Sequence, residues 1–207
     1  MLLGRLKIQK IIMKKSLSYF ILLLVLSLSS GCGYNSLQSR DEDTKAAWSE
    51  VTNQYQRRAD LVPNLVNVVK GYAAHEKEVL EEITNARAQV GTVKLSSADL
   101  GDEAAFKKFQ EAQTAMSSSL SRLLAVSENY PQLKADGVFR DLQAQLEGTE
   151  NRITVARKRY IDSVRDFNVT VRSFPSNLTA NYLGLKPKQT FTVENEQAIS
   201  KPPVVQF

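Results

Sequence analysis

Apolar residues recur at intervals of three and four along most of this chain, which places side chains on one face of an α-helix. The first stripe runs from Gln38 to about Tyr72 and comprises Trp48, Val51, Tyr55, Val62, Leu65, Val69 and Tyr72. Pro63 interrupts it, because a proline ring clashes with the preceding helical turn. With Asp60 as N-cap, Pro63 would lie in a first turn, where no hydrogen bond is lost. The pattern therefore predicts a helix restart or a kink at residues 60–63.

Two further helices follow from the same spacing. After the restart or kink at residues 60–63 the stripe resumes through Val79, Ile83, Ala86 and Val90 and ends at Gly91, so the second predicted helix runs from about Asp60 to Gly91. Residues 94–101 are predicted to form a loop. The third helix opens near Asp102 and Glu103, whose charges suit the positive end of a helix, and ends at about Tyr130 before Pro131. Its predicted core residues are Phe106, Phe109, Met116, Leu120, Leu123 and Val126.

The fourth stripe predicts one long helix from Val138 to Ser173, roughly 50 Å at 1.5 Å per residue. Its apolar residues are Phe139, Leu142, Leu146, Ile153, Ala156, Tyr160, Val164, Phe167, Val171 and Phe174. Four amphipathic helices with short links must bury their stripes against one another. The expected fold class is therefore all-α, an elongated antiparallel four-helix bundle that follows an N-terminal membrane-anchoring segment.

The chain ends in a short amphipathic stretch and a tail. Leu178, Tyr182 and Leu185 mark the stretch, and residues 186–207 are expected to be an extended tail, because Pro202 and Pro203 exclude helix there. The apolar end, Val204 to Phe207, is of the type captured by strand addition in PDZ-like sites. Tails of this kind more often pack along their own bundle, and both outcomes stay open.

Residues 1–31 have the order of an export signal, with Met13 as the predicted true start. Lys14 and Lys15 precede an apolar run from Tyr19 to Leu28, and small residues lead to Cys32. This ending resembles a bacterial lipoprotein signal, which makes Cys32 a lipidation candidate; an uncleaved transmembrane anchor is the alternative. Both alternatives attach the body, residues 32–185, to a membrane. The lysines before the run favour a body outside the cytoplasm.

Charge and reactive side chains exclude several functions. Lys and Arg total 27 and Asp and Glu total 22, and five of the basic residues but no acidic residue lie in residues 1–31, so the chain from Cys32 onward is balanced. A balanced body offers no clustered positive field, and we expect no nucleic-acid partner. One Cys and one His exclude a disulfide within the chain and any site needing two such ligands. We therefore expect no cofactor, no metal and no enzymatic activity.

Polar residues break two of the apolar stripes. The candidates for a polar layer between these breaks are Arg57, Arg58, Asp60, Glu147, Glu150, Asn151 and Arg152. Such a layer would set helix register as a buried Asn does in a coiled coil. Equally, Gly148 can mark a kink from which the charges point to water. A buried layer predicts a clear loss of melting temperature in both Glu150→Ala and Arg152→Ala.

Several motifs together resemble one family. Residues 60–66 read DLVPNLV, residues 70–76 KGYAAHE, residues 130–134 YPQLK, residues 146–152 LEGTENR, residues 156–160 ARKRY and residues 174–177 FPSN. From about Tyr34 to the C-terminus the chain is similar to the LemA family of bacterial envelope proteins. The resemblance implies a membrane-anchored helical bundle with no assigned reaction.

The expected function is that of a non-enzymatic interaction or scaffold module with an envelope protein partner. The alternative is a ligand- or signal-sensing bundle with a cleft between the second and fourth helices, lined by Tyr55, Tyr72 and Tyr160. The expected location is the bacterial cell envelope. In a Gram-negative cell, a lipidated Cys32 followed by Gly33 resembles the default signal for the outer membrane, facing the periplasm.

Overall fold

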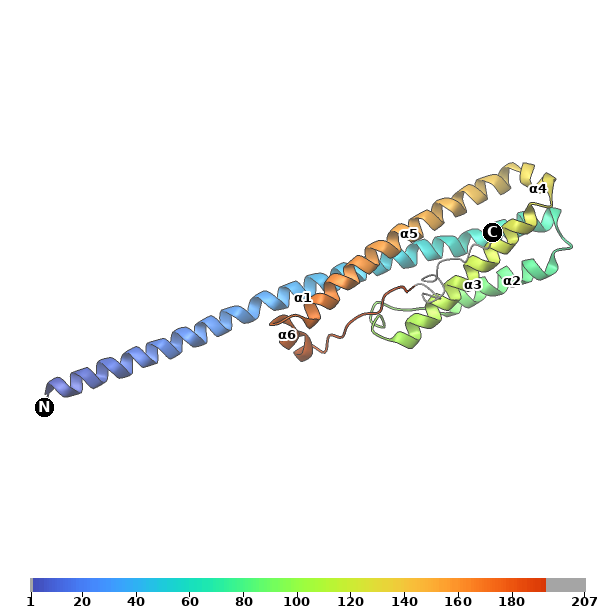
Figure 1. Ribbon diagram of the computed structural model, residues 1–207. Helices are drawn as coiled ribbons and strands as arrows, with labels where there is room; N and C mark the ends of the chain where they lie inside the picture. Colours follow the sequence, from blue (N-terminus) through green and yellow to red (C-terminus); the bar gives the residue numbers. More distant parts are fainter. Residues whose placement is uncertain (1, 193–207) are drawn as a thin grey trace, which may run out of the picture.

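A computed structural model describes residues 2–192, with side chains described for Tyr19 and from Gly33 onward. This part of the chain contains helices and irregular segments and no strand, so the all-α prediction is confirmed for it. The helices are α1 (Leu2–Tyr72), α2 (Lys77–Thr92), α3 (Glu103–Ser127), α4 (Pro131–Ala135), α5 (Gly137–Arg172) and α6 (Ser176–Tyr182). Figure 1 shows α1 extending well beyond the other helices toward its N-terminus.

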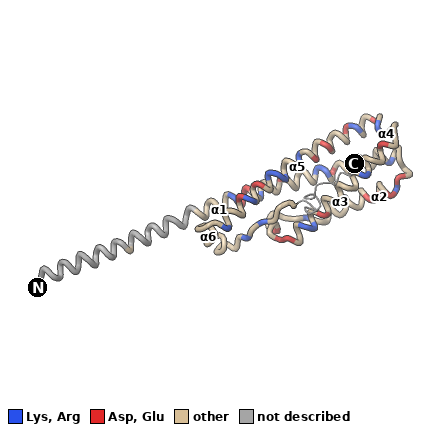
Figure 2. The backbone as a smooth tube through the Cα atoms, in the orientation of Figure 1, with Lys and Arg blue, Asp and Glu red and all other residues tan. Residues whose placement is uncertain are grey.

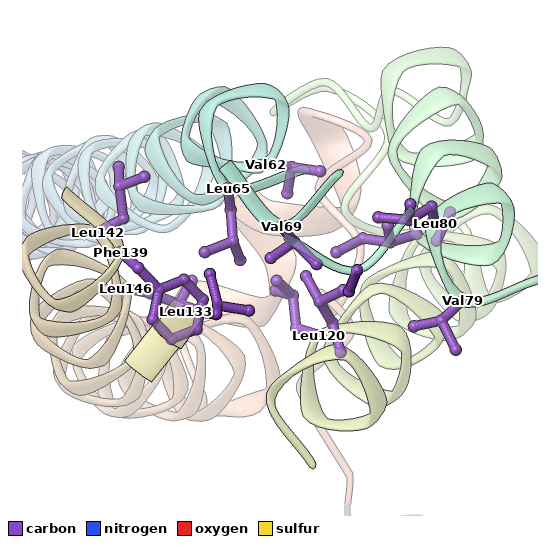
Figure 3. Packing of buried hydrophobic residues seen from close by; sticks show 14 of the residues in the cluster. Val62, Leu65, Val69, Val79, Leu80, Leu120, Leu133, Phe139, Leu142 and Leu146 are labelled. Atoms are coloured by element: carbon purple, nitrogen blue, oxygen red, sulfur yellow. The ribbon is translucent and has the colours of Figure 1, made fainter. Parts of the chain in front are cut away.

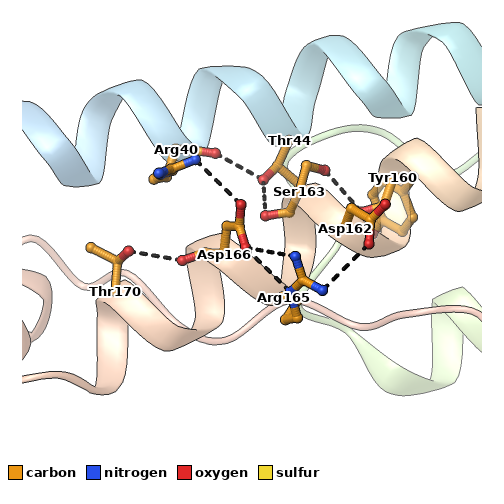
Figure 4. A network of polar contacts seen from close by, with 8 residues as sticks. All are labelled: Arg40, Thr44, Tyr160, Asp162, Ser163, Arg165, Asp166 and Thr170. Atoms are coloured by element: carbon orange, nitrogen blue, oxygen red, sulfur yellow. Dashed lines mark hydrogen bonds and ion pairs between the residues drawn. The ribbon is translucent and has the colours of Figure 1, made fainter.

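Two antiparallel pairs make up the helical body. From here on, the body means residues 33–192, which adds residues 186–192 to the predicted range. α5 lies along the C-terminal half of α1, and α3 lies along α2 (Figure 1). Contacts between α1 and α5 fix the direction of the first pair, because Arg40 meets Asp166 near one end and Tyr72 meets Asp136 at the other. Figure 4 shows the first of these contacts beside a second link, in which the Thr44 hydroxyl donates to a carbonyl of α5.

The third and fourth predicted helices are present as α3 and α5, although α3 ends at Ser127, three residues before the expected end. Asp102 caps α3 by accepting hydrogen bonds from the amides of Ala104 and Ala105, and α5 differs from the predicted range by one residue at each end. The apolar stripe of α5 is buried from Phe139 to Val171. Phe174 was expected to continue it but is 80% exposed, because α5 ends at Arg172 and the chain turns away.

The predicted restart at residues 60–63 is wrong. α1 continues through Pro63 to Tyr72, and the helix breaks instead at residues 73–76. The three- and four-residue spacing of apolar residues continues across this break, so the sequence pattern gives no sign of it. Pro63 has no N–H for the carbonyl of Ala59, four residues earlier. The Nε of Arg87, on α2, donates to that carbonyl at 3.1 Å. A side chain of the neighbouring helix thus replaces the hydrogen bond that proline removes.

This replacement predicts a dependence between two substitutions. Arg87→Ala should lower the free energy of unfolding by about 1 kcal/mol, since it leaves the Ala59 carbonyl without a donor. In a Pro63→Ala background the new N–H supplies that donor, and the same change should cost clearly less. Chemical denaturation of the four proteins in the cycle measures the difference. Equal costs of Arg87→Ala in both backgrounds would show that the hydrogen bond has no such role.

The core is divided along the length of the body. At the end far from the N-terminus, mostly aliphatic residues of five helices pack together, among them Val69, Leu120 and Leu142 (Figure 3). The middle is aromatic and is built around Trp48. At the end where α1 leaves the body, Leu37, Phe167, Val171 and Ala180 form a small third cluster.

α6 buries a different face from the one expected. Ala180 enters the third cluster, whereas Leu178 and Tyr182 are exposed. α6 packs on both α1 and α5 through Ala180 and the partly buried small polar residues Ser176, Asn177 and Thr179, so it has no continuous apolar stripe.

The segment after α6, residues 186–192, has no helix and crosses between the two helix pairs. The backbone of Lys188 exchanges two hydrogen bonds with the side chain of Asn168, and the amide of Gln189 donates to the carbonyl of Leu100 at 2.8 Å. Phe191 enters the aromatic core. We call residues 186–192 the strap; Val204 to Phe207 lie outside the described residues.

Among the described residues, no helix combines the length and the apolar character that crossing a bilayer requires. The apolar run from Tyr19 to Leu28 and the lipidation candidate Cys32 lie in α1, where Tyr19 is the one described side chain before Gly33. These two predictions therefore concern side chains outside the description.

Candidate functional site: a buried arginine between two clefts

Arg58 is the most unusual side chain of the core. α1 directs it toward α3, and only 2% of its surface is exposed. Its Nη2 donates to the Oε1 of Gln113 at 2.6 Å and to the carbonyl of the same residue at 3.2 Å. Its Nη1 donates to the hydroxyl of Ser117 at 2.7 Å and to a carboxylate oxygen of Glu150 at 3.1 Å. One side chain of α1 therefore links α3 and α5.

The surroundings of this guanidinium are mostly neutral. Glu150 provides the one carboxylate among its hydrogen-bond acceptors and is partly open to solvent, and the Tyr55 ring lies 5.0 Å from the guanidinium carbon. The Nε has no hydrogen-bond partner among the described residues. Burying a charged group costs free energy unless hydrogen bonds compensate for its lost hydration. Here the neutral acceptors of Gln113 and Ser117 provide most of these hydrogen bonds. Such a site fixes the position of α3 against α1 and α5.

The structure brings together two of the seven polar-layer candidates, Arg58 and Glu150. The other five, Arg57, Asp60, Glu147, Asn151 and Arg152, are exposed. Asp60 lies inside α1 and accepts a hydrogen bond from Gln56, so it does not cap a helix. Because Arg152 is exposed, we now expect Arg152→Ala to behave as a surface substitution. Gln113 and Ser117 were missed, since polar residues beside an apolar stripe look like a solvated helix face.

A polar groove of about 870 Å³ opens over Arg58 between α3 and α5. Its wall on α3 carries Gln113 and the hydroxyl residues Ser117, Ser118 and Ser121, and Arg157 lines it from α5. The guanidinium of Arg157 lies 4.4 Å from the centre of the Phe191 ring. The strap thus borders the groove.

A second cleft, of about 590 Å³, lies on the other side of Tyr55, between α1, α2 and the loop that follows α2. Trp48, Tyr55 and Phe109 supply aromatic surface, and Arg87 and Lys94 are the charged residues that line it. Burial raises the pKa of Tyr55, so its hydroxyl stays neutral at ordinary pH.

The three tyrosines expected to line one cleft do not lie together. Tyr55 borders both clefts, whereas Tyr160 is fully buried and donates to the carbonyl of Gln189 at 2.8 Å. Tyr72 is exposed at the far end of the body and donates to Asp136 at 2.9 Å. Tyr55 and Tyr72 lie 17 residues apart on α1, and Tyr160 lies on α5, so the three side chains are at different positions along the body.

The strap also closes a charged contact with α1. Lys188 contacts Asp41 at 2.5 Å, and Lys45 contacts the other carboxylate oxygen at 2.7 Å. Burial opposes ionisation of Asp41, but the two ammonium groups outweigh it and hold the pKa of that carboxyl below its ordinary value.

Acid should therefore weaken the fold through Asp41. The pKa of Asp41 is lower in the folded than in the unfolded protein. The contact therefore adds its full share to the free energy of unfolding above the unfolded-state pKa, about 4, and this share is lost as the pH falls through the folded-state pKa. Asp41→Asn should flatten this part of the stability profile, whereas Asp43→Asn, at an exposed site, should leave it unchanged. Thermal denaturation from neutral pH downward measures both. Parallel profiles for Asp41→Asn and wild type would contradict the assignment.

Comparison with known proteins establishes the family. The family model described as LemA family matches residues 47–207, which is most of the chain. The chain belongs to the LemA family. The resemblance found in the sequence motifs is thereby confirmed. For this LemA-family protein, the matched range includes Arg58, both clefts and the strap, and it begins after Cys32.

Three curated relatives, from two organisms, carry the name MamQ. Magnetosome proteins MamQ 2 and MamQ 1 of Paramagnetospirillum magneticum are each 27% identical to this LemA-family chain over 178 residues, which is 76% of this chain and 64% of the relative. Magnetosome protein MamQ of Magnetospirillum gryphiswaldense is 26% identical over 192 residues, which is 83% of this chain and 68% of the relative. The chain thus spans slightly less than two thirds of the first two relatives.

Proposed function

We propose that this protein is a membrane-anchored helical scaffold of the bacterial cell envelope that presents its body to a protein partner and catalyses no reaction. One observation carries the proposal: α1 is a single helix from Leu2 to Tyr72. The apolar run from Tyr19 to Leu28 and the core residues Val51 and Val69 therefore belong to the same rod. A rod of 71 residues is about 107 Å long at 1.5 Å per residue.

A continuous helix couples the anchor to the body without a hinge. The body is then held at a fixed height above the bilayer, as a scaffold or spacer requires. Lys14 and Lys15 before the run favour a body outside the cytoplasm. Relatives named as magnetosome proteins support association with a membrane-bounded structure. If the chain is cleaved before Cys32 and this residue is lipidated, the acyl chains anchor the N-terminal end of the remaining helix in place of the apolar run.

Cross-linking in intact cells followed by mass spectrometry tests the scaffold role. The full chain should give a discrete adduct with an envelope protein. A matched variant, in which a fully cleaved soluble signal replaces residues 1–31 and Cys32 is changed to Ser, should lose most of that adduct, because the body is no longer held at the membrane. Equal adducts from both proteins, or none from either, would contradict the proposal.

The second cleft favours one other function, the binding of a small anionic aromatic ligand. Its aromatic surface beside Arg87 and Lys94 suits a planar apolar group that carries a carboxylate, and no acidic residue lines it. Trp48 forms part of the wall and reports on occupancy. Titration with aromatic carboxylates should then change Trp48 fluorescence saturably, less in Lys94→Ala than in the exposed control Lys107→Ala. A flat titration would exclude this function.

A further inference from the structure

α6 exposes apolar side chains that nothing in the described structure covers. Leu178 is 60% exposed and Tyr182 is 90% exposed, and one helical turn separates them on the same face of α6. Phe174, just before the helix, is 80% exposed. Apolar residues gathered on the open face of a short helix are typical of a contact surface. We call Phe174, Leu178 and Tyr182 the α6 face.

The α6 face lies at the end of the body where α1 leaves it (Figure 1). Ser176, the first residue of α6, contacts α1 at Gly33, where an added Cβ would lie 3.6 Å from the Cα of Ser176. On its inner side α6 is held by Ala180, packed with Leu37 and Phe167. Its position along α1 is therefore fixed at the level of Gly33.

The sequence of α1 sets the distance from this level to the proposed anchor. The apolar run ends at Leu28, five residues before Gly33, which is about 8 Å along a helix. If the run lies in the bilayer, as the proposed function holds, α6 lies within the headgroup layer or directly above it. The inference rests on that proposed anchoring.

The charge of this end of the body suits a lipid surface. Residues 167–192 contain Arg172, Lys186 and Lys188 and no Asp or Glu, and residues 33–39 of α1 carry no charge. Figure 2 shows α6 without charged residues, in contrast to the mixed charges along α2, α3 and α5. α6 itself therefore presents no carboxylate to anionic headgroups, and the nearby Asp41 is paired with Lys45 and Lys188.

We propose that the α6 face is a membrane-surface contact that inserts Phe174, Leu178 and Tyr182 among the lipid headgroups and so sets the tilt of the body. Aromatic side chains with a polar tip, such as Tyr182, are enriched at this depth of a membrane. A single transmembrane helix or lipid chain leaves tilt and rotation free, and a second contact at the bilayer surface restricts both.

Depth-dependent quenching in proteoliposomes tests the proposal. The full chain is reconstituted in vesicles of phosphatidylcholine and phosphatidylglycerol, with or without bromine on the acyl chains. Tyr182→Trp should add tryptophan emission that the brominated lipid quenches. The buried Trp48 of wild type supplies the baseline and should lose no emission. Val138→Trp is the matched control, since Val138 is 58% exposed at the opposite end of α5.

The outcomes separate this inference from the proposed function. Failure of the protein to sediment with vesicles would overturn the anchoring and the inference with it. Sedimentation without quenching at position 182 would overturn the inference alone. An emission shift at position 182 that depends on protein concentration and not on brominated lipid would show a second protein copy on the α6 face, which also overturns it.

Discussion

Phe191→Ala is expected to lower the free energy of unfolding by about 3 kcal/mol, a loss matched only by that expected for Arg58→Ala. The Phe191 ring is buried with its centre 5.1 Å from that of Phe106 and 5.6 Å from that of Tyr160. It also stacks against Trp48 at 6.2 Å. Its loss leaves a cavity among rigid rings that cannot close it, and it frees the strap from α3 and α5.

Phe174→Ala provides the matched control for this prediction. The two residues are of one type and lie in the same C-terminal part of the chain, but the Phe174 ring is exposed and should change stability by no more than about 0.5 kcal/mol in detergent solution. Urea denaturation followed by circular dichroism measures both variants. A Phe191→Ala protein as stable as Phe174→Ala would show that the strap does not hold the body together.

Arg58→Ala is the second change with a large expected effect, again about 3 kcal/mol. It removes the donor to the buried Oε1 and carbonyl of Gln113 and the packing of the arginine stem beside Tyr55. Leaving a buried acceptor unpaired costs the free energy of its lost hydration, and the vacated space adds a cavity. Arg57→Ala, on the neighbouring exposed residue, is the control and should be near neutral.

Two further variants separate polar pairing from packing at this site. Arg58→Met keeps most of the volume and should recover part of the loss, but not the part due to Gln113. Glu150→Ala should cost less than about 1 kcal/mol, because that carboxylate is partly hydrated. Thermal and urea denaturation of Arg58→Ala, Arg58→Met, Glu150→Ala and Arg57→Ala ranks the four variants by their loss of stability. An Arg58→Ala protein no less stable than Arg57→Ala would contradict the assigned role.

The regular part of the fold could be predicted because its signals are local. The nine apolar residues of the predicted stripe that lie in α5 and the cap at Asp102 specify their helices through neighbours in sequence. Pro63 misled the prediction because the compensating donor, Arg87, belongs to another helix. No periodicity within α1 reports on that contact. The true break after Tyr72 was hidden for the converse reason, since the apolar spacing continues across it.

The candidate site was predictable only on one side. A polar residue inside an apolar stripe pointed to Arg58 and, across the body, to Glu150. Nothing in the sequence pattern marked its neutral acceptors on α3, because Gln113 and Ser117 lie beside the apolar stripe and do not interrupt it. Phe191 was missed since a lone aromatic residue in an irregular tail has no period to reveal its burial. Long-range contacts of this kind need the assembled fold.

The central claim is that residues 1–32 hold the body of this LemA-family protein at a membrane. Fractionation of cells expressing the full chain tests it most directly, with successive washes of the membrane pellet in high salt and urea before detergent is added. We expect the protein to stay in the pellet through both washes and to be released by detergent, because high salt screens charges without weakening apolar burial and urea does not dissolve the bilayer. Recovery of the full-length chain in the soluble fraction, or its release by salt alone, would contradict the account.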